Sequence, residues 1–193
     1  MALSKINTGG LAADAVDNTI LDLAANFAFT GTVSGAGFTP KVAVVSDQKS
    51  NATVGGGFTN NGWRTRDLNT KDDPDSIVTL SSNQITLGAG TYNVYFTAPA
   101  FKVQTHHTRF YNVTDSVTEG YGSNAVQNAN AEDSNHSMGF ALFTIASGTK
   151  TYELQHICST TKATNGMGIA QAGISGNTGL PETYAIVNII QVG

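Results

Sequence analysis

The sequence predicts an all-β sandwich preceded by an N-terminal arm. Two observations predict the sandwich: short runs rich in Val, Ile, Thr, Tyr and Phe follow one another along most of the chain, and Gly, Asn, Ser and Asp turns separate them at roughly 8–12-residue spacing. A third observation, one short helical stripe, is confined to the N-terminal end. With 193 residues, the chain is long enough for one well-packed domain and an arm.

Residues 1–35 form the predicted arm. Within 11–26, apolar residues recur at helical spacing, which predicts about four turns of helix, and an isolated helix of that length is marginal in water. The segment after it reads as extended chain. We therefore expect the arm to be ordered by docking on a partner surface or on sister chains; a disordered leader is the alternative. The residues expected to make that contact are Val16, Ile20, Leu23, Phe27 and Phe29.

Residues 36–193 form the predicted β-domain. Its strand candidates are 41–46, 62–69, 76–80, 83–87, 90–97, 100–104, 107–113, 138–146, 150–158, 165–171 and 182–192. Two long segments, 47–61 and 121–137, are rich in Asn, Gly and Ser and are predicted to be loops, and loops of that length are usually functional or flexible. We find no internal repeat and no sustained heptad.

Composition excludes several function classes. Ten Lys and Arg face fourteen Asp and Glu, whereas a nucleic-acid-binding protein is usually basic. No apolar run approaches the roughly 18 residues that a membrane span needs, and the first residues lack the hydrophobic core of a signal peptide. We therefore expect no membrane insertion, no nucleic-acid partner and synthesis in a cytosol. The single cysteine, Cys158, excludes an intrachain disulfide.

Two strand candidates are apolar on both faces. In 184–192, Tyr184, Ile186 and Ile190 alternate with Ala185, Val187 and Ile189, and 138–146 shows the same pattern. A sandwich strand with one wet face alternates apolar and polar residues instead. One face can fill the core, so the second needs a cover. Another copy of the chain is the predicted cover, and a loop of the same chain is the alternative.

Two segments resemble a known superfamily. Residues 85–101, Ile-Thr-Leu-Gly-Ala-Gly-Thr-Tyr-Asn-Val-Tyr-Phe-Thr-Ala-Pro-Ala-Phe, resemble the mid-domain strands of the tumour-necrosis-factor and complement-globular-head superfamily. Residues 184–192 resemble its C-terminal strand, which lies near the trimer axis. The resemblance implies a ten-strand jelly roll that forms a homotrimer. The residues expected at the trimer interface are Tyr95, Phe143, Ile145, Tyr184, Val187 and Ile189.

A second set of motifs carries a closer resemblance. Trp63, Arg66, Leu68, Asn69 and Thr70 match a Trp-x-x-Arg-x-Leu-Asn-Thr element that is found in jelly-roll proteins of tailed bacteriophages, which the sequence resembles more closely. An Asp-Ser-Ile-Val strand is matched at 75–78 and a Thr-Arg-Phe-Tyr-x-Val-Thr strand at 108–114. Residues 26–35 resemble N-terminal segments of virion proteins. The motif residues are expected to be structural, and Trp63 as an anchor for a sugar or protein is the alternative.

The resemblance implies a structural protein on the surface of a virion, made in the bacterial cytoplasm, with no enzymatic activity and no cofactor. Two roles compete. In a capsid decoration (cement) protein, residues 1–35 bind the major capsid protein. In a tail-fibre or receptor-binding protein, the arm binds a tail or baseplate protein, and 47–61 and 121–137 contact host glycan or protein. Decoration is preferred because 35 residues reach at most about 115 Å and no shaft repeat is present.

Candidate chemical sites are weak. The sequence has no nucleophile elbow and no phosphate-binding glycine loop. His106 and His107 are adjacent and point to opposite faces of a strand, whereas His156 and Cys158 share a face; neither pair completes a metal site, so no metal is expected. A glycan-active enzyme is a third function class, but Glu119, Glu153 and Glu182 show no pairing in the sequence.

An acidic cluster lies at Asp72, Asp73 and Asp75, around a proline. Its spacing does not fit an EF-hand loop. A solvated turn is the preferred interpretation, and a Ca²⁺ site is the alternative.

Overall fold

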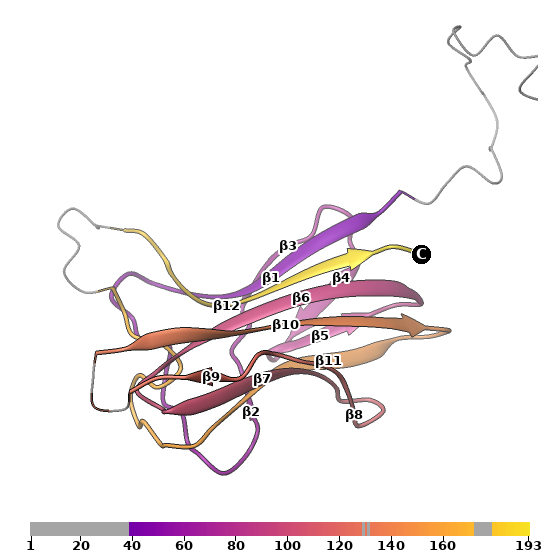
Figure 1. Ribbon diagram of the computed structural model, residues 1–193. Helices are drawn as coiled ribbons and strands as arrows, with labels where there is room; N and C mark the ends of the chain where they lie inside the picture. The colour runs from indigo at the N-terminus through magenta and orange to yellow at the C-terminus, as the bar shows by residue number, and fades with distance from the viewer. Residues whose placement is uncertain (1–38, 129, 131, 172–178) are drawn as a thin grey trace, which may run out of the picture. The chain divides into compact units, whose positions relative to one another are not determined.

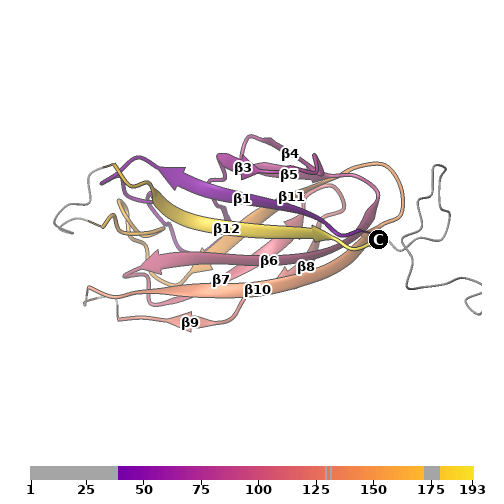
Figure 2. The same ribbon diagram turned by 90° about the horizontal axis from the view of Figure 1, so that it is seen from above.

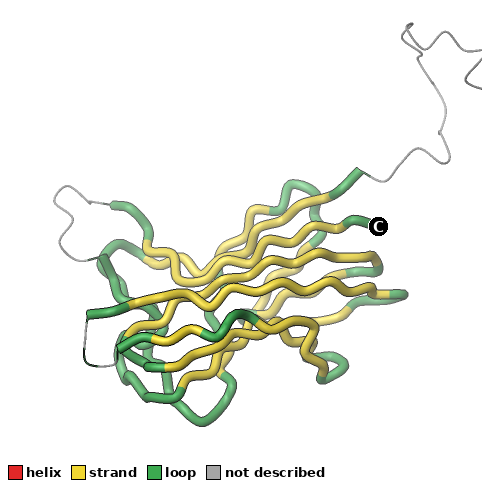
Figure 3. The backbone as a smooth tube through the Cα atoms, viewed as in Figure 1, coloured by secondary structure: helices red, strands yellow, loops and turns green. Residues whose placement is uncertain are grey.

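The computed structural model describes residues 39–128, 130, 132–171 and 179–193 (Figure 1). The helix and the attachment residues predicted within 1–35 lie outside them. The described chain consists of strands, turns and loops, without a helix (Figure 3). The strands are β1 (Lys41–Lys49), β2 (Arg64–Thr65), β3 (Thr70–Asp72), β4 (Val78–Ser81), β5 (Gln84–Leu87), β6 (Gly90–Phe101), β7 (Thr105–Asn112), β8 (Val117–Tyr121), β9 (Ala125–Val126), β10 (Ser134–Ile145), β11 (Lys150–Cys158) and β12 (Glu182–Gln191).

The strands form two antiparallel sheets that lie face to face. One sheet has the order β10-β6-β12-β1-β3, and its first four strands cross the front of the view in Figure 2. The other has the order β4-β5-β11-β7-β8, with β2 paired to β11 and β9 paired to β7. The predicted all-β sandwich is therefore confirmed. The twelve strands exceed the ten that the resemblance implies, and β2 and β9 have only two residues each.

Aromatic side chains fill the space between the sheets. The rings of Phe110 and Tyr152 stack 5.1 Å apart, and Phe96 and Phe143 each lie 6.0 Å from Phe110. The core continues through apolar residues of both sheets: Ala43, Val45, Leu68, Val78, Ile85, Leu87, Tyr92, Val94, Ala98, Ala141, Ile145, Leu154, Ala185, Val187 and Ile189. A second cluster gathers around Phe58, with Ala100, Val103, Cys158 and Met167.

The residue types explain a hairpin turn and the position of a proline within a strand. The β4–β5 hairpin turns at Ser82 and Asn83, whose φ angles of 51° and 65° are those of a tight hairpin turn. The predicted strand 90–97 and the first two residues of the predicted strand 100–104 belong to the single strand β6, which continues through Pro99 and ends at Phe101; residues 102–104 lie outside any strand. Pairing of β12 with β6 ends at Thr97, so Pro99 lies where β6 has one neighbour fewer and its missing N–H is tolerated.

Two predicted strands are wrong in extent or kind. Only Arg64–Thr65 of the predicted strand 62–69 is assigned to a strand, since the chain then turns inward and buries Arg66 and Leu68. The predicted strand 165–171 is turn and loop instead, and Gly166 lies against the Phe58 side chain. The predicted loop 121–137 contains β9 and the first residues of β10.

Candidate functional site

The outward side of the five-stranded sheet is apolar and exposed. Strand register aligns Val44, Asn188, Tyr95 and Phe140 in one row, and Val42, Ile190, Asn93 and Leu142 in the next. We call the following residues the outer apolar face: Val42, Val44, Tyr95, Met138, Phe140, Leu142, Ile186 and Ile190. Leu142 is 72% exposed, Phe140 68%, Met138 49%, Val42 47%, Val44 38% and Ile190 36%.

The outer apolar face is held together by its own contacts. The Tyr95 and Phe140 rings lie 5.0 Å apart in a tilted arrangement across β6 and β10. None of its eight residues carries a charge, and Asn93 and Asn188 in its rows are uncharged amides, but the first row continues from Val44 to the exposed Asp72 on β3. The prediction that β10 and β12 are apolar on both faces is thereby confirmed. Because the outer face stays exposed, the described residues do not supply the covering loop considered as the alternative.

Most of the residues predicted at a trimer interface lie inside one chain instead. Val187, Ile189, Ile145 and Tyr184 are buried, and Phe143 stacks on Tyr92 at 5.8 Å. The four buried residues need no second copy to cover them, so their placement at an interface is a wrong prediction, whereas that of the partly buried Phe143 stays a prediction. Alternation along a strand separates two faces, but it does not tell which one points inward when both are apolar. Of the six, Tyr95 lies on the outer apolar face.

Three residues of the phage-like motif, Arg66, Leu68 and Asn69, have structural roles. The fully buried Arg66 guanidinium donates to the carbonyl oxygens of Met167 and Tyr184, both at 2.8 Å. Leu68 belongs to the core. Asn69 accepts from the Gln48 N–H at 2.9 Å and donates to its carbonyl oxygen at 2.8 Å. Trp63 differs, because its half-buried side chain lies on the outward side of the seven-stranded sheet.

Trp63 belongs to a group of rings and polar side chains on that sheet. The Arg109 guanidinium lies between two rings, 4.2 Å from the centroid of Trp63 and 4.1 Å from that of Tyr111. His107 contacts Trp63 and Tyr121 edge-on, at centroid distances of 6.1 and 5.4 Å. Sequence reasoning raised Trp63 alone; the other rings come from β7 and from the end of β8, so only the strand pairing brings them together.

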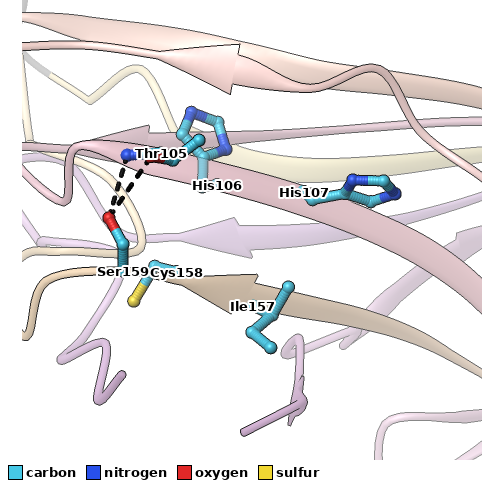
Figure 4. Close-up of a pocket in the computed structure, with 6 residues that line it drawn as sticks. All are labelled: Thr105, His106, His107, Ile157, Cys158 and Ser159. Atoms are coloured by element: carbon cyan, nitrogen blue, oxygen red, sulfur yellow. Dashed lines mark hydrogen bonds between the residues drawn. The ribbon is translucent and has the colours of Figure 1, made fainter. Parts of the chain in front are cut away.

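Beside His107 lies a shallow hollow of about 240 Å³ (Figure 4). It is lined by Thr105, His106, His107, Ile157, Cys158 and Ser159. Ser159 Oγ accepts a hydrogen bond from the Thr105 N–H at 3.1 Å, which ties the end of β11 to the start of β7. Burial raises the pKa of the Cys158 thiol to about 11, so this cysteine is a poor nucleophile.

Two histidines form a buried chain of hydrogen bonds. His106 Nε2 lies 2.6 Å from Asn135 Oδ1, and His106 Nδ1 lies 2.9 Å from His156 Nε2. An amide oxygen only accepts, so His106 Nε2 donates to it, and His156 Nε2 must donate to His106 Nδ1. His156 Nδ1 is then a buried acceptor without a partner. Over the described residues, no group of three His, Cys, Asp or Glu side chains could hold a metal ion.

The acidic turn is bound to the backbone. Asp73 Oδ1 accepts from the Ile77 N–H at 2.9 Å, and its Oδ2 accepts from the Val78 N–H at 3.0 Å. Asp75 accepts from the Val42 N–H at 2.9 Å. Partial burial opposes ionisation of Asp73, but these N–H donors and Lys71 lower its pKa nonetheless. Asp73, at the centre of the cluster, therefore serves the fold.

The three glutamates weighed as catalytic residues are likewise engaged. Glu153 accepts from Thr65 and Gln84, both at 2.8 Å, on the outward side of the seven-stranded sheet. Glu182 accepts from the Ala52 N–H at 3.1 Å, and Glu119 accepts from Asn112 at 3.0 Å. They are placed on three different strands, and each fixes a neighbouring segment.

Comparisons with known proteins bear on the fold. No protein-family model matches the sequence, and no curated protein matches it either. Among solved structures, the chain is similar to the globular domain of the zebrafish complement 1qA protein, with 17% identity and a TM-score of 0.46, over 80% of this chain and 97% of that one. It is also similar to murine APRIL at pH 5.0, with 7% identity and a TM-score of 0.47, over 79% and 99%. Each likeness concerns the fold alone. Within the described residues, no helix could cross a lipid bilayer.

Proposed function

We propose that the chain is a non-enzymatic structural protein that assembles into a homotrimer through the outer apolar face. The observation that carries this proposal is the exposure of six large apolar side chains on one side of one sheet. Soluble monomers rarely expose a contiguous apolar patch of this kind without using it. Burying a Leu or Phe side chain completely contributes about 1.5–3 kcal/mol, so a few such residues favour association strongly.

Another copy of the chain is the occupant that fits this face. The eight residues of the face carry no charge, and the acid in its rows, Asp72, lies on the edge strand β3. The amides of Asn93 and Asn188 can pair with one another across the contact. A cyclic arrangement closes upon itself and leaves no copy of the face exposed. The number three is supported by the sequence resemblance of 85–101 and 184–192, whose relatives place the closing strand near a three-fold axis.

The sequence resemblance alone supports a location on a tailed-phage virion. In this proposal the trimer is a capsid decoration protein, and residues 1–35 attach it to the major capsid protein through Val16, Ile20, Leu23, Phe27 and Phe29. A tail-fibre or receptor-binding role is the second candidate. The observation that favours it is that residues next to the two long loops, Trp63 and Tyr121, lie 6.4 Å apart on one surface.

Sedimentation equilibrium at micromolar concentration tests the assembly. We expect a trimer for the full chain and a monomer for Leu142→Glu and Phe140→Glu, because a charge on the outer apolar face must be desolvated on association. Val126→Glu is the matched control: Val126 is 70% exposed, as Leu142 is 72%, but it lies on β9 outside the face. A monomeric wild-type chain, or three variants that all remain trimeric, overturns the proposal. Circular dichroism checks that each variant is folded.

The copy number per virion separates the two roles. Hundreds of copies per particle are expected for a decoration protein, and tens or fewer for a tail protein. Particles without a decoration protein lose resistance to heat while they still adsorb to cells. Particles without a receptor-binding protein fail to adsorb. Absence of the chain from purified particles refutes both roles and leaves the assembly test unaffected.

A further inference from the structure

The outward side of the seven-stranded sheet carries a surface whose chemistry differs from that of the outer apolar face. Its rings belong to Trp63, His107 and Tyr121, and its polar side chains to Arg109 and Asn124. We call these five residues the aromatic site. Tyr121 is 58% exposed, Asn124 is exposed, and the other three are half-buried. We propose that the aromatic site binds one hexopyranose unit of a glycan.

The rings are fixed in place by contacts from several strands. The ring centroids of Trp63 and Tyr121 lie 6.4 Å apart, and their planes are inclined at 41°. His107 contacts the edges of both. Its Nδ1 lies 2.6 Å from Asn124 Oδ1 and donates to it, which holds the Asn124 amide beside the rings. Rigid aromatic surface costs little conformational entropy when a ligand packs on it.

Arg109 supplies directional hydrogen-bond donors next to these rings. Its Nε and one Nη donate to Gln155 Oε1 at 2.8 and 2.6 Å, and the other Nη donates to Thr118 Oγ1 at 3.3 Å. Three of the five N–H donors of a guanidinium are thus engaged, and two remain for another acceptor. Because the guanidinium is held between Trp63 and Tyr111, those donors keep a fixed direction.

The charges around Arg109 and the volume of the neighbouring hollow indicate which class of ligand can bind. Gln155 links Arg109 to a carboxylate: its Oε1 accepts from Arg109, and its Nε2 donates to Glu153 Oε2 at 2.7 Å, so a negative charge lies close to the guanidinium. An uncharged ligand suits such a surface better than an anion does. The neighbouring hollow of about 240 Å³ is smaller than the roughly 300 Å³ at which enclosed small-molecule pockets begin. It has room for part of a sugar ring, not for a whole ligand.

A neutral hexopyranose combines the properties that this surface selects. Its C–H face packs on an aromatic ring, and its hydroxyl groups accept from the free Arg109 donors and from the Asn124 amide. A shallow, partly aromatic surface with few fixed polar groups contacts one sugar unit of a longer glycan. The aromatic site lies on the opposite side of the sandwich from the outer apolar face, so sugar binding does not require the trimer.

Tryptophan fluorescence tests the proposal directly, because Trp63 is the only tryptophan. The full chain is titrated with the methyl glycosides of glucose, galactose and mannose, and with methyl glucuronide as an acidic sugar. We expect a saturable change with at least one of the three neutral glycosides, in the millimolar range. No saturable change with any neutral glycoside, or a change with the glucuronide alone, overturns the proposal.

Variants of Tyr121 locate the binding. We expect Tyr121→Ala to weaken binding about tenfold or more, as loss of an aromatic anchor does, and Tyr121→Phe to retain it, since the ring remains. Asn124→Ala is a second variant, and we expect it to weaken glycoside binding several-fold. Val126→Ala, on the neighbouring strand β9 and 70% exposed, is the matched control and should bind as the wild type. Equal binding by Tyr121→Ala and wild type refutes the site. The Leu142→Glu chain, which is expected to be a monomer, should bind the glycosides as the wild type does. This variant therefore tests the sugar site independently of the trimer.

Discussion

Arg66 is a charged side chain without exposed surface, and it joins parts of the chain that are far apart in sequence. Besides the carbonyl oxygens of Met167 and Tyr184, its guanidinium reaches that of Pro99 at 3.4 Å. Burial lowers its pKa to about 10, while Asp47 and Asp67 oppose that change. Burial also raises the pKa of Asp47. Lys49 also pairs with Asp47, at 3.1 Å, so this buried carboxyl has two neighbouring cations and keeps one of them when Arg66 is removed.

We expect Arg66→Met to lower the free energy of unfolding by about 3–5 kcal/mol, because three carbonyl groups lose a donor and the buried Asp47 carboxyl loses a neighbouring cation. Arg64→Met is the matched control. Arg64 is exposed and donates to the Thr59 carbonyl oxygen at 3.3 Å, so its loss should cost less than about 1 kcal/mol. Urea unfolding curves measure both. Equal losses for the two variants contradict the assigned role of Arg66.

The buried histidines make stability depend on pH. Burial lowers the pKa of His156 well below its usual range, and Arg66 and the other histidines lower it further. Burial also lowers the pKa of His106, where Asn135 opposes the change. A protonated His156 needs an acceptor at Nδ1, and that atom has none. Folding therefore requires the neutral form of this pair.

We expect the urea midpoint to be constant above about pH 7 and to fall as the pH drops below about 6.5. The unfolded chain takes up protons in this pH range and the folded chain does not. The free energy of unfolding therefore falls by up to about 1.4 kcal/mol per pH unit for each such histidine. His156→Gln should reduce this slope, because one differential proton is lost. A midpoint that does not change between about pH 7.5 and pH 5.5 contradicts the prediction.

At the scale of elements, the long strands could be predicted and the short ones could not. The strand 150–158 was predicted with the bounds of β11, because β-branched and aromatic residues fill it between two turn signals. By contrast, β3, β8 and β9 are short or polar, and they form only because neighbouring strands pair with them. The inward face of β12 was assigned wrongly for a related reason: only the second sheet decides which apolar face is covered.

The acidic turn before β4 illustrates how one side chain fixes an element. Since Asp73 accepts from the Ile77 and Val78 N–H groups, we expect Asp73→Ala to lower the free energy of unfolding by about 1–2 kcal/mol. Asp72→Ala is the control, because Asp72 is exposed on β3. Thermal unfolding measures both variants, and the same scan with added Ca²⁺ should show no shift. A higher melting temperature with Ca²⁺ would show that the acidic cluster binds the cation.

For the whole molecule, the two outward sides of the sandwich have opposite chemistry. The five-stranded sheet presents mainly apolar side chains, with Asp72 on its edge strand β3, and the seven-stranded sheet presents rings interspersed with charged and amide groups. An assembly that buries the first side leaves the second exposed in every copy. If the proposed trimer and the proposed sugar site both exist, each trimer carries three linked sugar sites, and linked sites bind a glycan chain more tightly because they act at a high effective concentration.

Residues 1–35 and the β-domain are expected to have separate functions, attachment to the particle and assembly of the trimer. The buried core and the outer apolar face lie between Val42 and Ile190, so we expect a chain that lacks 1–35 to sediment as the full chain does. Co-sedimentation with phage particles is expected to be lost, because the predicted attachment residues Val16, Ile20 and Leu23 are gone. Equilibrium sedimentation and particle pelleting measure the two properties separately. A truncated chain that becomes monomeric shows that the arm makes the assembly, and one that still pellets with particles shows that the β-domain carries the anchor.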